Sequence, residues 1–173
     1  MIVKVINYDP QWKDAFLSEA NHIRKLLGNE VVNIFHIGST AVEGLKAKPV
    51  IDIMPIVNDI SHLDKYSAHF EELGYEVMDE FGIPGRRYFR KGGKNRTHQI
   101  HAFQFDNIQD IERHLAVRDY LRTHETARRK YGDLKARLAS KFPADIESYF
   151  TGKETFVSTM EKEAIKWLYS IRT

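Results

Sequence analysis

The sequence has no cysteine among its 173 residues. This absence excludes a disulfide framework and any metal site built from thiolates. It is consistent with a cytoplasmic location, which we expect for this chain.

Long apolar runs are also absent. The longest, Val50–Val57, is interrupted by Asp52 and is far shorter than the roughly 20 residues that cross a bilayer. Residues Met1–Ile6 look like a strand and lack the basic and long apolar regions of a secretion signal. We expect no membrane partner, and we predict a single domain over residues 1–173.

Acidic residues are missing between Phe81 and Phe105, where six basic residues occur: Arg86, Arg87, Arg90, Lys91, Lys94 and Arg96. Such a cluster can attract a phosphorylated ligand, or it can be a solvated loop. A general nucleic-acid binder should spread its basic groups over a larger face, so we do not expect nucleic acid as a partner.

Apolar spacing predicts an α+β chain with a helical C-terminal part. A helix should follow Asp9-Pro10 and end at Gly28. Pro55 should stop its strand or move that strand to a sheet edge. The remaining elements are predicted as strands at 31–37, 50–57 and 75–78, a helix over 61–74, a hairpin over 86–105, and helices from residue 108 onward.

The most informative stretch is His36–Leu45 with the following Lys48–Met54. It predicts a strand, a Gly-Ser turn, a short helix and a second strand that buries Asp52. A buried carboxylate needs a hydrogen-bond donor, a cation or a metal, since leaving it unpaired costs several kcal/mol. Gly38, Ser39 and Thr40 can offer backbone N–H groups and hydroxyls to a phosphate.

The spacing of Ser39 and Asp52 matches the geometry used by the nucleotidyltransferase superfamily. There the strand carries Asp-x-Asp or Asp-x-Glu, and the two carboxylates bind magnesium side by side. Here Met54 stands at the second position. The residues that could replace the missing carboxylate are Glu43, His98, His101 and Asp106, and the sequence does not choose among them.

The candidate metal ligands are Asp52, His98 and His101, with magnesium or manganese as the expected divalent ion. His98 and His101 are three residues apart, so on a regular strand they point to opposite faces. A simpler interpretation is that Asp52 only accepts hydrogen bonds from the Gly-Ser-Thr turn and joins the two strands.

Further candidates for phosphate recognition are Lys48, Arg86 and Arg87, because ammonium and guanidinium groups bind oxyanions. Lys135 and Arg118 could also reach the cleft if the helical C-terminal part packs over it. The sequence lacks a Walker A motif, a G-x-G-x-x-G fingerprint and a G-x-S-x-G elbow, which argues against the enzyme classes that use them.

With these residues identified, the chain resembles the GrpB family, an uncharacterised group assigned to the nucleotidyltransferase superfamily. The resemblance is carried by His36-Ile37-Gly38-Ser39-Thr40-Ala41-Val42-x-Gly44-Leu45-x-x-Lys48-Pro49-x-Ile51-Asp52 and by the basic arm that leads to His98-x-x-His101. Later segments also match: 118–122, Ala127-x-x-x-Tyr131-x-x-Leu134-Lys135 and Tyr149-x-x-x-Lys153-x-x-Phe156.

The resemblance implies a polymerase-β-like mixed sheet with flanking helices, and it implies that related domains occur fused to dephospho-CoA kinase. Three interpretations remain open, the simplest being a structural interaction domain with an inert cleft. The chain could be a metal-dependent nucleotidyltransferase that acts on a nucleoside triphosphate and an unknown acceptor, with Asp52 as its catalytic residue. Alternatively, it could be a non-catalytic binding module for a phosphorylated metabolite such as a coenzyme A precursor. The sequence does not indicate an oligomeric state.

Overall fold

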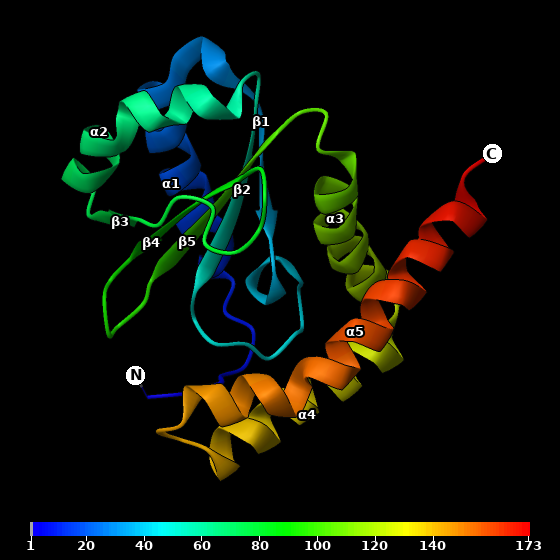
Figure 1. The fold of residues 1–173 in the computed structure, drawn as a ribbon. Coiled ribbons are helices and arrows are strands. Elements are labelled where there is room, and N and C mark those ends of the chain that lie inside the picture. The colour runs from blue at the N-terminus through cyan, green and yellow to red at the C-terminus, as the bar shows by residue number, and fades with distance from the viewer. Residues whose placement is uncertain (1) are drawn as a thin grey trace.

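Five strands form one mixed sheet in the order β1-β2-β5-β4-β3 (Figure 1). The computed structural model describes residues 2–173. Strands β2 and β5 are parallel, and the other neighbouring pairs are antiparallel. The strands are β1 (Val31–Ile37), β2 (Ile51–Val57), β3 (Tyr75–Val77), β4 (Arg86–Lys91) and β5 (His98–Gln104).

Helices flank the sheet and continue beyond it, which confirms the predicted α+β fold with a helical C-terminal part. The α-helices are α1 (Gln11–Leu27), α2 (Ser67–Glu72), α3 (Ile108–Thr123), α4 (Glu125–Lys141) and α5 (Ile146–Ile171), and short 3₁₀ segments are η1 (Gly28–Glu30), η2 (Ser39–Ala41) and η3 (Ile60–Tyr66). Among residues 2–173, no helix has both the length and the apolar character needed to span a membrane.

The two faces of the sheet bury different helices because successive strand residues point to opposite sides. Ile53 of β2 packs with Ile23 of α1 and Phe70 of α2. Met54, the next residue along β2, faces the other side and packs in the cluster that Ile111 of α3 joins. Met54, which stands where the superfamily has its second carboxylate, is therefore part of an apolar core.

Helices α4 and α5 do not cover the sheet faces. They lie past one end of the sheet, where β1 ends and β2 begins (Figure 1). There Val42 and Leu45, from the connection between these strands, pack against Tyr131 of α4 and Met160 of α5. This contact brings the C-terminal helices against the Gly-Ser turn.

The prediction that Pro55 would place its strand at a sheet edge is wrong. Strand β2 lies between β1 and β5, and Pro55 is paired with Ile34 of β1. On the β5 side, Ile53 and Ile56 are paired with residues of β5, whereas the two residues between them are not paired in this ladder. Proline is tolerated in this inner strand because it lies where the β2–β5 ladder is interrupted.

Two other local predictions need correction. Residues 2–6 form no strand. Their backbone contacts include a single bridge from Ile6 to Ala47 and a hydrogen bond of 2.8 Å from the Val3 amide to the Pro143 carbonyl. Met1 lies outside the described residues. The helix expected over 61–74 is divided into η3 and α2. Asp59 caps η3 by accepting a hydrogen bond from the Ser61 amide.

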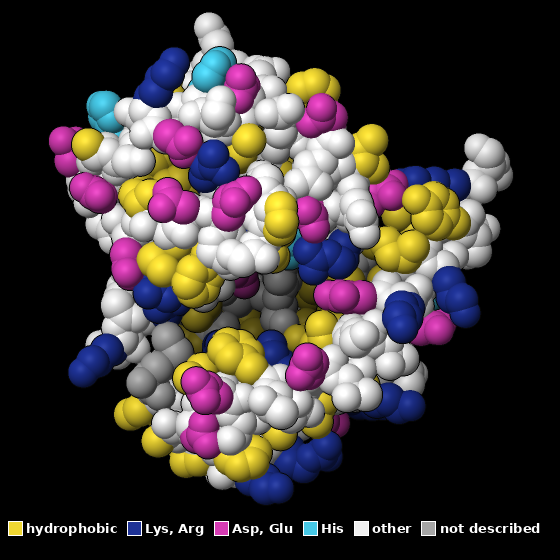
Figure 2. Space-filling model, viewed as in Figure 1, with side chains coloured by type: hydrophobic (Ala, Val, Ile, Leu, Met, Phe, Trp, Pro, Cys, Tyr) yellow, Lys and Arg dark blue, Asp and Glu magenta, His cyan; other side chains and the backbone are white. Residues whose placement is uncertain are grey.

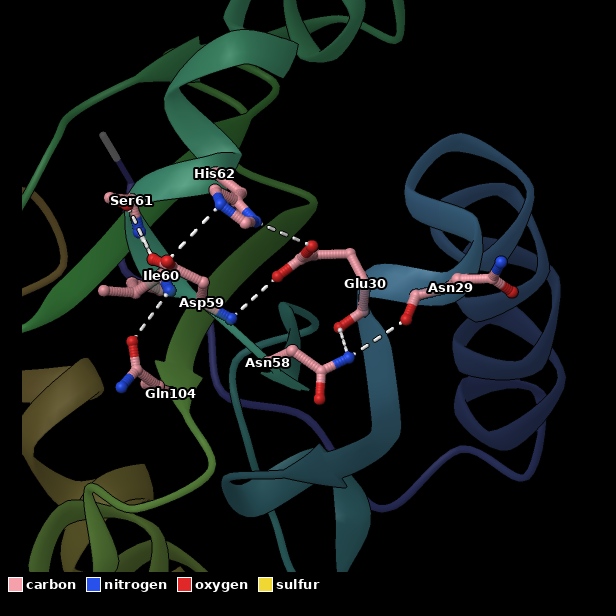
Figure 3. A network of polar contacts seen from close by, with 8 residues as sticks. All are labelled: Asn29, Glu30, Asn58, Asp59, Ile60, Ser61, His62 and Gln104. Carbon is pink, nitrogen blue, oxygen red and sulfur yellow. Dashed lines mark hydrogen bonds and ion pairs between the residues drawn. The ribbon is translucent and has the colours of Figure 1, made fainter.

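A polar network holds the opposite end of the sheet (Figure 3). The Glu30 carboxylate accepts from the Asp59 amide at 2.7 Å and lies 3.0 Å from Nδ1 of His62. The Ile60 amide donates to the side chain of Gln104 at 3.1 Å. These bonds fix the ends of β1, β2 and β5 relative to one another, so the candidate site at the other end has a rigid support.

Candidate functional site

The Gly-Ser turn and Asp52 lie side by side, as the sequence predicts. Ile37, the last residue of β1, is paired with Asp52 across the antiparallel ladder. Gly38 follows with φ of 72°, and a Cβ atom there would lie only 2.6 Å from Oδ2 of Asp52. Only glycine combines this backbone conformation with so close an approach to the carboxylate.

A cavity of about 140 Å³ lies beside this contact, and Ser39 and Asp52 both line it. Its other walls come from helices α4 and α5 and from the connection between β1 and β2. Three lysines line it, namely Lys48, Lys135 and Lys153. Figure 2 shows this side of the molecule hollowed between the sheet and the C-terminal helices.

Asp52 accepts hydrogen bonds from two side chains of β5. Nε2 of His101 lies 3.0 Å from Oδ1 of Asp52. When the Gln99 amide is oriented with its nitrogen toward Asp52, it donates at 2.9 Å, and its oxygen accepts from Arg96 at 3.3 Å. The carboxylate is therefore held in place by His101 and Gln99 while part of it still faces the cavity.

Arg86 fixes the protonation pattern of His101. Its guanidinium lies 3.4 Å from Nδ1 of His101 and is itself anchored by the carbonyl oxygens of Glu80 and Phe81. Since a guanidinium can only donate, Nδ1 of His101 must accept, and the ring proton is on Nε2, facing Asp52. Arg86 thus acts on the carboxylate through His101 rather than lining the cavity.

Lys135 is the most deeply buried of the three lysines, with 2% of its surface exposed. Its ammonium donates to Oγ of Ser39 at 2.7 Å and lies 4.4 Å from the centre of the Tyr131 ring. Burial, followed by repulsion from Lys153 and Lys48, lowers the pKa of Lys135 well below its usual value, while Asp52 opposes that shift.

Lys48 and Lys153 lie together over the rings of Tyr149 and Phe150. Their ammonium groups are 4.6 Å and 5.3 Å from the centre of the Phe150 ring. Burial and the charge of Lys153 lower the pKa of Lys48 to about 8. Burial also lowers the pKa of Lys153. The Tyr149 hydroxyl, which is fully buried, has no hydrogen-bond partner among the described residues.

Two other predicted phosphate ligands are already bound within the protein, although Thr40 lines the cavity. The hydroxyl of Thr40 is engaged, because it lies 3.0 Å from Nε2 of His36 and donates to the carbonyl of Val50 at 3.2 Å. Burial lowers the pKa of His36 to about 4, so this ring is neutral at pH 7. Arg87 points to the opposite face of the sheet, where it binds Asp64 at 2.8 Å.

His98 is not brought together with Asp52. Its ring contacts the hydroxyl of Thr97 at 2.9 Å. Burial lowers the pKa of His98, and the charge of Glu19, on α1, opposes that shift. His98 and His101 are thus on opposite faces, as their spacing indicates. Arg118, which could have reached the cleft, instead donates to the carbonyl of His36 at 3.3 Å and lines a different cavity with Glu43.

The comparisons with known proteins can now be set beside this geometry. The family profile described as "GrpB protein" matches residues 2–163. The chain belongs to the GrpB family.

Relatives with sequences and structures similar to this chain support that assignment. The chain is 39% identical over 165 residues to the UPF0157 protein YqkA of Bacillus subtilis, an alignment that covers 95% of this chain but 48% of YqkA, so this chain spans about half the length of that relative. A crystal structure of the conserved protein GrpB from Enterococcus faecalis superposes with a TM-score of 0.93 at 44% identity, covering 96% of this chain and 99% of that one. A more distant similarity, 24% over 189 residues, covers 95% of this chain and 46% of a dephospho-CoA kinase of Mycobacterium tuberculosis.

The geometry of the nucleotidyltransferase superfamily predicts a divalent metal, but the residues near Asp52 do not fit one. The second position of the usual carboxylate pair is Met54, which is fully buried in the apolar cluster under α3. Among residues 2–173, no group of three histidine, aspartate or glutamate side chains could hold an ion. Ammonium groups line the same cavity and would oppose a cation. No metal-dependent step follows from these residues, and the magnesium or manganese ion stays a prediction.

Sequence reasoning missed Lys153 and gave Lys135 only a conditional role. Both residues occur in motifs typical of the family, Tyr149-x-x-x-Lys153 and Tyr131-x-x-Leu134-Lys135. These motifs place each lysine one helical turn after a tyrosine, on the same face of its helix. That pattern was the available signal, because a lysine on the apolar side of a helix must be buried or must face a ligand.

Restoring the second carboxylate with Met54→Asp tests this description of the site. The new carboxylate would enter an apolar cluster without a partner, so we expect the free energy of unfolding to fall by at least about 3 kcal/mol. Met54→Leu is the matched control and should lower it by less than about 1.5 kcal/mol. Urea unfolding with and without magnesium measures both. Stabilisation of Met54→Asp by magnesium would contradict the description.

Proposed function

We propose that this protein binds a phosphorylated small molecule, with the phosphate group in the cavity between Ser39, Asp52 and the three lysines. The observation that carries the proposal is that one buried lysine, Lys135, and two half-buried lysines, Lys48 and Lys153, share a cavity with a single carboxylate. Desolvating several like charges without enough counter-charge is unfavourable. An anionic ligand would supply the missing negative charge.

The charge and size of the cavity favour a phosphate group over other anions. A phosphate monoester carries close to two negative charges at pH 7. Together with Asp52 it would balance Lys48, Lys135 and Lys153. The volume of about 140 Å³ suits one or two phosphate groups rather than a whole nucleotide. The rest of the ligand would therefore lie outside this cavity.

Asp52 has a definite part in such a site. Its charge raises the pKa of all three lysines and so opposes the effect of their burial. Since His101 and Gln99 hold the carboxylate, Asp52 would keep the lysines protonated without closing the cavity.

A second candidate is transfer of a nucleotidyl group from a nucleoside triphosphate to an unknown acceptor. The close contact of Gly38 with Asp52 favours this function. In the nucleotidyltransferase superfamily, the phosphate-binding turn lies against the carboxylate strand in this way. Release of pyrophosphate from ATP that stops in Asp52→Asn would support transfer over binding alone. The similarity to a dephospho-CoA kinase makes a phosphorylated coenzyme A precursor a further ligand to test.

Lys135→Met tests the proposed binding site directly. We expect this variant to bind inorganic phosphate and pyrophosphate at least about tenfold more weakly than the wild type, because a charge-assisted hydrogen bond is removed. Binding to the wild type should survive chelation of divalent metal. Isothermal titration calorimetry measures the affinities. Lys25→Met, on the exposed side of α1, is the control and should bind normally. Equal binding by both variants would refute the proposed site.

The affinity for inorganic phosphate should also depend on pH. With a pKa of about 8, Lys48 is charged below that pH and neutral above it, so affinity should fall between pH 7.5 and 9.5. Lys48→Met should bind more weakly and lose much of this dependence, whereas Lys48→Arg should bind well throughout the range. Calorimetry at several pH values distinguishes these cases. Affinity that stays constant or rises in the wild type would contradict the assignment.

A further inference from the structure

A second hollow lies next to the phosphate cavity, along helix α5. Phe150 and Lys153 line both spaces, and the second measures about 520 Å³. It extends along α5 to Glu161 and includes Tyr131 of α4. A ligand whose phosphate lay among the lysines could therefore place its remaining atoms here.

The second hollow differs from the first in its chemistry. Besides Lys153, it is lined by the carboxylates of Glu154 and Glu161, and Thr151 and Ser158 contribute hydroxyls. Glu154, Ser158 and Glu161 are spaced four and three residues apart, so they share one face of α5. From Lys153 to Glu161, over about 12 Å of helix, the side chains that line the hollow change from hydrogen-bond donors to acceptors.

Aromatic side chains stand at the junction of the two hollows. Phe150 is 47% exposed, whereas Tyr131 is buried and has Lys135 over its ring. Asp52 and Glu161 both help to raise the pKa of Tyr131 to about 12, after the larger effect of burial. Tyr131 is thus within electrostatic range of both Asp52 and Glu161.

From this arrangement the geometry points to a sugar phosphate as the ligand class, with the sugar in the hollow along α5. Sugar hydroxyls donate to carboxylates and exchange hydrogen bonds with serine and threonine hydroxyls. The C–H groups of a sugar ring suit the negative face of an exposed aromatic ring such as Phe150. An alkyl chain would leave Glu154 and Glu161 without hydrogen-bond donors. The inference rests on the proposed phosphate site.

The test compares three probes by calorimetry: inorganic phosphate, ribose 5-phosphate and n-butyl phosphate. We expect the wild type to bind ribose 5-phosphate about tenfold more tightly than n-butyl phosphate, which has no hydroxyls. The double variant Glu154→Gln/Glu161→Gln should lose that preference. Because it removes negative charge near the lysines, the same variant should bind inorganic phosphate as tightly as the wild type, or more tightly. Glu163→Gln, on a different side of α5, is the matched control.

The outcomes separate the inference from the proposed function. If inorganic phosphate binds and Lys135→Met abolishes that binding, while ribose 5-phosphate and n-butyl phosphate bind equally, the sugar assignment is overturned and the phosphate site stands. A double variant that keeps the full preference for ribose 5-phosphate also overturns the assignment of Glu154 and Glu161. If none of the three probes binds to the wild type, both the proposed function and this inference fail.

Discussion

The crowding of three ammonium groups around the carboxylate of Asp52 is the constraint on which the rest of the site depends. Lysine is rarely buried without a partner, because its charge loses hydration. Here Lys135 has a neutral hydroxyl as its direct hydrogen-bond partner, and Lys48 and Lys153 lie over aromatic rings. The remaining folded structure must offset the cost of holding these charges together. Such an arrangement is common where a binding site is kept ready for a charged ligand.

The fold brings the four charged residues together from distant parts of the chain. Asp52 belongs to an inner strand of the sheet, whereas Lys135 and Lys153 belong to the two helices that cross beyond its edge (Figure 1). Lys48 comes from the connection between β1 and β2. Packing of Val42 and Leu45 against α4 and α5 fixes the distance between the sheet and the helices. The site is therefore a product of tertiary packing, and loss of that packing would disperse it.

The parts of the structure that depend on short-range patterns could be predicted from the sequence. Strand 31–37 and the helix ending at Gly28 were predicted with the bounds that the structure has, because apolar spacing and a terminal glycine determine them locally. The meeting of the Gly-Ser turn with Asp52 was also predicted correctly. Their separation of thirteen residues allows little more than a turn and the return to an adjacent strand.

The parts that depend on long-range packing could not be predicted in the same way. Alternation along β4 shows that Arg86 and Arg87 point to opposite faces, but it does not show which face carries the site. The roles of Lys135 and Lys153 depend on how α4 and α5 dock, which local periodicity does not specify. Pro55 was misjudged because the interruption in the β2–β5 ladder is a property of the assembled sheet.

The most direct measurement of the central claim is a crystal structure with tungstate, a phosphate analogue whose heavy atom can be located by anomalous scattering. The account predicts one dominant tungstate ion within hydrogen-bond distance of Lys135 and of Lys48 or Lys153, with Asp52 still bound to His101. A structure that leaves this cavity without the ion at saturating tungstate, while the ion binds only elsewhere on the protein, would contradict the account.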